Sequence, residues 1–150
     1  MQIGRKHLPH TPPPSLVIGQ EDEVYFITIC CQPRGYHQLT QATVWAAIQE
    51  SSEHRQKLGQ WKIRLILAMP DHLHLLASFP SKQPMEKTIR HFKSWLAKQH
   101  SIQWQDGFFD HRLRSWESAV EKRKYILNNP LRAGLVTKVE DWPFWWEPGK

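Results

Sequence analysis

The sequence predicts an α+β fold, in which a ferredoxin-like antiparallel sheet carries helices on its faces and a further helix follows towards the C-terminus. Three observations carry this prediction. Runs rich in β-branched and aromatic residues mark strands over 24–31, 61–69, 72–79 and 107–114. Apolar residues at helical spacing mark helices over 40–57, 85–100 and 115–128. Without the last helix, the order is strand, helix, strand, strand, helix, strand, which is that of a ferredoxin-like unit.

Local signals place the ends of these elements. Thr40 can cap the first helix and Ser115 the last. Pro70 and Asp71 separate the second strand from the third by a turn, and Pro130 is expected to end the last helix. Within the second strand, apolar residues alternate with regular spacing at Trp61, Ile63, Leu65, Leu67 and Met69.

We expect a single domain over residues 21–150, preceded by an extended basic arm over 1–20. The arm holds four of the eleven prolines, and Arg5 and Lys6 make it basic. The net charge of the chain is +6, which favours a polyanionic partner but also fits ordinary solubility.

The two adjacent cysteines offer no disulfide framework, and no apolar run approaches the ~20 residues of a membrane span. A cytoplasmic location is therefore expected, with no membrane partner.

His72 and His74 lie two residues apart on the third predicted strand, so both rings point to one face. Leu73, Leu75 and Ala77 fill the alternate positions and can supply the core, which leaves the histidine face to point outward. Two imidazoles on such a face can bind one metal ion. With nine histidines in the chain, however, the pair alone also fits a structural role.

Tyr125 lies on the last predicted helix, with Asn129 one turn further along the same face. The amide oxygen of Asn129 can serve as a metal ligand. A run of cations surrounds the tyrosine and could hold a phosphate backbone beside it: Lys122, Arg123 and Lys124. Each of these residues could instead be an ordinary part of a packed helix.

Taken together, these motifs resemble a known family. MPDHLHLL is similar to the histidine-hydrophobic-histidine signature of the HUH endonucleases. KSW, GFFDHRLR and above all YILNNPLRAGLV resemble the REP-associated tyrosine transposases, which are relatives of the single-tyrosine insertion-sequence transposases. The likeness runs from about Tyr25 to Phe144.

The resemblance implies an enzyme that cuts and joins single-stranded DNA. His72 and His74 would ligate a divalent metal, Tyr125 would attack the phosphate, and Asn129 would complete the metal site. Mg²⁺ is implied by the family, and the imidazole ligands favour Mn²⁺ at least as well. Asp110, His111 and Arg114 lie in a stretch typical of the family, but no chemical role follows for them.

The resemblance also implies a partner, namely hairpins of repetitive extragenic palindromes with single-stranded DNA beside them. The protein would act as a monomer or homodimer in the bacterial nucleoid. Residues that could contact this DNA lie in the arm and on two helices: Arg5, Lys6, Lys87, Arg90, Lys93, Trp95, Lys122, Arg123 and Lys124.

Two other functions stay open. A non-catalytic DNA or RNA hairpin binder would need the basic surface but not the histidines and tyrosine. A metal-dependent phosphoesterase with a water nucleophile would need carboxylate ligands, and near the histidine pair only Asp71 is available.

Overall fold

The computed structural model describes residues 23–80 and 84–149, so the predicted arm at 1–20 lies outside the described residues. The elements in chain order are β1 (Tyr25–Cys30), α1 (Ala42–Lys57), β2 (Lys62–Met69), β3 (His72–Ser78), α2 (Met85–His100), β4 (Phe109–Arg112), α3 (Trp116–Leu127), α4 (Asn129–Arg132), a 3-10 turn (Val139–Asp141) and β5 (Trp145–Trp146). None of the helices within the described ranges is both long and apolar enough to cross a membrane.

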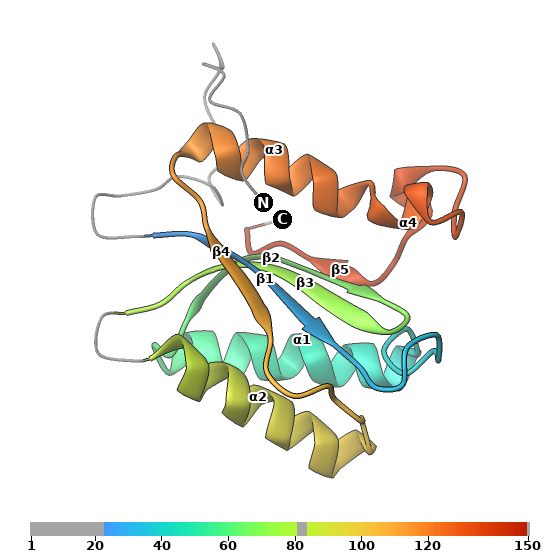
Figure 1. The fold of residues 1–150 in the computed structure, drawn as a ribbon, viewed down its shortest axis with the longest axis horizontal. Coiled ribbons are helices and arrows are strands. Elements are labelled where there is room, and N and C mark those ends of the chain that lie inside the picture. Colours follow the sequence, from blue (N-terminus) through green and yellow to red (C-terminus); the bar gives the residue numbers. More distant parts are fainter. Residues whose placement is uncertain (1–22, 81–83, 150) are drawn as a thin grey trace.

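The sheet has the order β4-β1-β3-β2-β5, and every pairing is antiparallel. Helices α1 and α2 cover one face, while α3 lies over the other (Figure 1). The first four strands and two helices reproduce the expected ferredoxin-like unit, and α3 is the added helix. The α+β prediction is therefore confirmed.

Both faces of the sheet are buried, because each carries its own apolar cluster. Ile27, Leu73 and Leu75 belong to the cluster under α1 and α2. Leu67 and Leu76 belong to the cluster under α3. The prediction that the histidine face points outward is therefore wrong, since α3 and the C-terminal segment pack on it.

Strand β2 serves both clusters through an irregularity in its pairing with β3. The register shifts between Ile63 and Leu65. Trp61 and Ile63 therefore pack in the cluster under α1 and α2, whereas Leu65 and Leu67 pack in the cluster under α3. The regular alternation expected across this strand is broken by the bulge, as bulges shift side chains between faces.

Several boundaries differ from the predicted ones. Helix α1 starts at Ala42 with Gln41 as its N-cap, so Thr40 does not cap it. Ser115 caps α3 as predicted, and its Oγ accepts a hydrogen bond from the backbone N–H of Ser118. Helix α3 ends at Leu127, one residue from the predicted end at Asn128. Pro130 lies in the first turn of the next helix, α4, where its missing N–H costs nothing.

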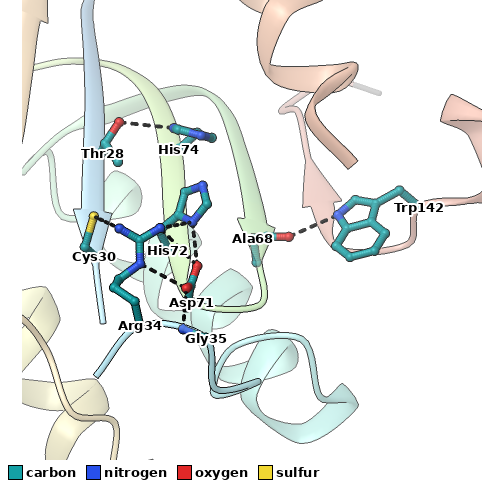
Figure 2. Close-up of polar contacts among 9 residues, drawn as sticks. All are labelled: Thr28, Cys30, Arg34, Gly35, Ala68, Asp71, His72, His74 and Trp142. Carbon is teal, nitrogen blue, oxygen red and sulfur yellow. Dashed lines mark hydrogen bonds and ion pairs between the residues drawn. The ribbon is translucent and has the colours of Figure 1, made fainter. Parts of the chain in front are cut away.

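The tryptophan-rich C-terminal segment packs against the sheet. Trp142 is buried, and its indole N–H donates to the carbonyl of Ala68 at 3.0 Å (Figure 2). Trp145 and Trp146 pair with β2 as β5. Glu147 is fully buried and binds the guanidinium of Arg123 on α3. This segment therefore attaches the tyrosine-bearing helix to the sheet.

Candidate active site

The two histidines lie side by side on β3, on the sheet face that α3 covers. Their ring centroids are 4.7 Å apart and their planes are nearly perpendicular. Nδ1 of His72 lies 2.8 Å from a carboxylate oxygen of Asp71. Nδ1 of His74 lies 3.1 Å from the hydroxyl of Thr28 on β1 (Figure 2). With both Nδ1 atoms engaged, each ring keeps its Nε2 available as a ligand.

Asp71 is hydrogen-bonded to His72 and to two groups of the segment after β1. Its carboxylate accepts hydrogen bonds from Arg34 Nε at 2.9 Å and from the Gly35 amide at 2.8 Å, besides its contact with His72 (Figure 2). Partial burial raises the pKa of this carboxyl, but the hydrogen bonds outweigh burial and hold that pKa well below its usual range. A carboxylate beyond a histidine ligand is a common way to fix the ring and its tautomer.

Both imidazoles are held in their neutral form, which is the form that binds metals. Burial, followed by the charges of His72, Lys122 and Arg132, lowers the pKa of His74 to about 3. Burial also lowers the pKa of His72, against the opposing hydrogen bond to Asp71. Neutral pH therefore leaves the two rings deprotonated.

The two imidazoles fit a metal ion whose remaining ligands come from substrate or solvent. Within the described residues, no group of three or more histidine, cysteine, aspartate or glutamate side chains is placed to hold a metal ion. The two Nε2 atoms would thus need oxygen ligands from an amide, from water or from a phosphate. Sites with open positions of this kind are typical of catalytic rather than structural metals.

Tyr125 extends from α3 and is 43% exposed. The Nζ of Lys122 lies 4.6 Å from the centre of its ring, and the guanidinium of Arg132 lies 4.2 Å from it. Lys122 also lies 4.5 Å from the ring of Phe26, which stacks on His74 at 5.3 Å. A continuous series of contacts therefore joins the tyrosine to the histidine pair.

Lys122 is almost completely buried, at 1% exposure. Within the described part of the chain, no carboxylate pairs with it, and its ammonium is held by the two aromatic rings. Burial, reinforced by the charge of Arg132, lowers its pKa. A buried cation without an acidic partner reduces the stability of the protein. Its presence here therefore suggests a role in function rather than in folding.

Asn129 is half-buried at the start of α4. Its expected position rested on one continuous helix, but α3 ends at Leu127 and a new short helix begins at Asn129. Its role as a metal ligand stays a prediction.

Three of the cations expected to contact DNA are held within the protein. Lys122 is buried with its ammonium against two aromatic rings, so it cannot contact a phosphate. The other two are hydrogen-bonded inside the protein. Arg123 forms two hydrogen bonds to the buried Glu147, at 2.6 and 2.8 Å. Lys93 donates to the carbonyls of Gln105 and Gly107 at 2.9 and 2.8 Å. Both side chains hold elements together, so we do not assign them phosphate contacts. Lys124 is exposed on α3 and stays available.

The remaining expected contacts lie away from Tyr125. Helix α2 is on the opposite face of the sheet from α3 (Figure 1), and it carries Lys87, Arg90 and Trp95 at exposed positions. Phe92 on the same helix is a core residue against Trp61, so it cannot stack on a base. Arg5 and Lys6 lie outside the described residues.

Sequence reasoning missed four residues around the site, namely Phe26, Thr28, Arg34 and Arg132. The first two become visible once the β1–β3 register is known, because Thr28 lies opposite His74. Arg34 comes from a loop far from Asp71 in sequence, and no local pattern marks it. Arg132 lies within the motif that the sequence highlighted but carried no signal of its own.

Comparison with known proteins identifies the chain as a member of a transposase family. The family model described as "Transposase IS200 like" matches residues 21–129, which is more than half of the chain, and the chain belongs to this family. The resemblance to REP-associated tyrosine transposases is also confirmed. One such protein from Haemophilus influenzae is 28% identical over 140 residues, covering 81% of this chain and 77% of the relative. One from Escherichia coli is 25% identical over 123 residues, covering 80% and 73%.

Solved structures share the fold. A REP-associated tyrosine transposase bound to a REP hairpin superposes with a TM-score of 0.72 at 20% identity, covering 94% of this chain and 82% of that one. A transposase from Deinococcus radiodurans gives a TM-score of 0.53 at 15% identity, covering 85% and 97%.

Proposed function

We propose that this transposase is a metal-dependent single-strand DNA endonuclease and strand transferase of the HUH single-tyrosine type, with Tyr125 as the nucleophile. The observation that carries the proposal is the series of contacts from Tyr125 through Lys122 and Phe26 to His74. It places an exposed phenol, a buried cation and two neutral imidazoles on one face of the sheet. A mere hairpin binder has no need of this set.

His72 and His74 would hold the metal ion through their Nε2 atoms, and we propose Asn129 as a further ligand. A bound Mg²⁺ or Mn²⁺ would polarise the scissile phosphate and stabilise its developing negative charge. The second open function, a phosphoesterase with carboxylate ligands, is disfavoured because Asp71 is already bound by Arg34, Gly35 and His72.

The chemistry of the step follows from the tyrosine. Its hydroxyl oxygen forms a bond to phosphorus, the phosphodiester bond to one sugar oxygen breaks, the hydroxyl loses its proton and the departing sugar oxygen gains one. The phosphotyrosine keeps the energy of the diester. A second strand end can therefore attack it and be joined without ATP.

The substrate that we propose is single-stranded DNA next to a hairpin. One solved relative of this fold is bound to a REP hairpin, and Tyr125 must reach a single backbone to attack it. Two further points stay predictions. The protein is expected to act as a monomer or homodimer, and it is expected to associate with the nucleoid.

The proposal is tested by incubating the protein with end-labelled hairpin DNA that carries a single-stranded flank, in Mn²⁺, and separating the products on a denaturing gel. We expect labelled DNA covalently attached to protein. Cleavage without an adduct would favour a water nucleophile, and neither cleavage nor adduct would favour a binding protein.

Asp71→Asn keeps the shape of the side chain but removes the charge that holds His72 and Arg34. We expect the affinity for Mn²⁺ to fall about 10- to 100-fold, as is usual when the partner of a histidine ligand is weakened. Titration calorimetry on the DNA-free protein measures this directly. Asp110→Asn, at an exposed position on β4, is the matched control. If Asp71→Asn bound Mn²⁺ as tightly as Asp110→Asn and the wild type, Asp71 would have no part in the metal site.

Lys122→Met separates the catalytic use of the buried cation from its structural use. Methionine fills similar space without the charge, so we expect stability to rise by about 1 kcal/mol, or about 2–4 °C in melting temperature. Adduct formation should nevertheless slow by about 100-fold, because the positive charge beside the attacking phenol is lost.

Lys124→Met, at an exposed position on the same helix, should leave the melting temperature unchanged. A less stable Lys122→Met protein with full cleavage activity would show that the lysine serves packing alone.

A further inference from the structure

Strand β4 presents a large aromatic side chain at the open edge of the sheet. Phe109 is 62% exposed and is the first residue of this edge strand. It lies in the stretch GFFDHRLR, whose residues Asp110, His111 and Arg114 have no assigned chemical role. A large apolar side chain exposed at a sheet edge favours unwanted association unless it has a binding partner.

The strand register places Phe109 on the same face as the histidine pair. Phe109 lies directly opposite Thr28 in the β1–β4 ladder, and Thr28 lies directly opposite His74 in the β1–β3 ladder. Directly paired residues point to the same side of a sheet. The contact between the Thr28 hydroxyl and His74 confirms which side this is. Phe109 is therefore two strand spacings from His74, or about 10 Å.

Within the described residues, this part of the face is open, whereas the rest is covered. Helix α3 contacts β2 and β3, and its Lys122 reaches as far as Phe26 on β1. His111, the other β4 residue on this face, lies opposite Phe26 and is half-buried. Phe109 lies one step further from this covered row and keeps most of its surface exposed.

We propose that Phe109 is a stacking platform for an unpaired DNA base that flanks the phosphate attacked by Tyr125. The inference rests on the proposed function and adds a base-binding site to it. Every base has a π-face that can stack on an aromatic ring. Arg132, which is exposed beside Tyr125, supplies positive charge for the backbone, and the distance from His74 suits a base near the scissile phosphate.

The competing occupant of this edge is a strand from a second copy of the chain. The edge is poorly suited to it, because β4 has only four residues and carries Asp110 and Arg112, both exposed. Short length and charged side chains are the usual protection of an edge against strand addition.

The test measures binding of the full-length protein to a hairpin with a single-stranded flank and to the same hairpin without it, in chelator so that no cleavage occurs. Phe109→Ala should weaken binding of the flanked hairpin about 10-fold and leave the unflanked hairpin unchanged. With 2-aminopurine at successive flank positions, the wild-type protein should quench one position by stacking, and Phe109→Ala should lose that quenching.

Three further variants identify stacking as the cause. Phe109→Trp should retain the affinity and the quenching, whereas Phe109→Leu, which is apolar but not aromatic, should lose the quenching. Leu58→Ala removes a similarly exposed apolar side chain at the end of α1. This variant should bind both hairpins with the wild-type affinity.

The inference is overturned if Phe109→Ala weakens both hairpins equally, or if Phe109→Leu binds and quenches like the wild type. It is also overturned if Phe109→Ala turns a dimer into a monomer in sedimentation without changing the flank affinity. Failure of the proposed function is a separate result. If the wild-type protein forms no adduct on the flanked hairpin, the nuclease proposal fails, whereas normal adduct with no effect of Phe109→Ala on flank binding refutes the stacking site alone.

Discussion

The Tyr125→Phe protein is expected to bind flanked hairpin DNA as tightly as the wild type and to form no covalent adduct. Only one hydroxyl is removed, and the ring between Lys122 and Arg132 is kept, so the local packing survives. Without the phenolic oxygen, no bond to phosphorus can form at this position. A denaturing gel measures the adduct, and fluorescence anisotropy in chelator measures the affinity.

The other two tyrosines provide matched controls. Tyr25 donates a hydrogen bond to Glu23 and packs in the cluster under α1 and α2, on the face away from the histidines. Tyr36 is exposed in the segment between β1 and α1. Tyr25→Phe and Tyr36→Phe should both form adduct at the wild-type rate. If adduct persists in Tyr125→Phe and disappears in one of these variants, the nucleophile has been assigned to the wrong tyrosine.

The fold was predictable from sequence because its strands and helices carry strong local patterns. What failed were inferences about faces. The bulge between Ile63 and Leu65 moves the later residues of β2 to the other side, and nothing in the alternating sequence marks it. His74 was expected to point outward, but a helix from the far end of the chain covers its face, and local periodicity cannot show this.

The same limit applies to the candidate site. Residue types and motif resemblance identified His72, His74 and Tyr125. In the structure the two histidines lie on one face of the sheet, and Tyr125 lies on the helix that covers this face. The interactions that orient them are long-range: Thr28 with His74 spans 46 positions and Arg34 with Asp71 spans 37. The partners of a cation are equally hidden, because Arg123 looks like a phosphate contact until Glu147 is seen beside it.

Loss of either histidine is expected to abolish metal-dependent cleavage while leaving most of the DNA affinity. His72→Ala and His74→Ala each remove one of the two nitrogen ligands, and we expect the cleavage rate to fall at least about 100-fold. Affinity should change little, because phosphate contacts by basic residues supply most of it. Single-turnover cleavage at several Mn²⁺ concentrations measures the first effect, and anisotropy the second.

The two histidine rings differ in burial, so the two variants should differ in their effect on stability. His74 is 7% exposed and stacks on Phe26, so His74→Ala also leaves a cavity and should lower the melting temperature. His72 is more accessible, so His72→Ala is the cleaner test, with the exposed His91→Ala on α2 as its control. Asn129→Ala should lose less activity than either, because water can replace one oxygen ligand. If both histidine variants cleaved at the full rate in chelator, the metal site would have to be abandoned, and the exposed Arg132 would be left as the cation that stabilises the attacked phosphate.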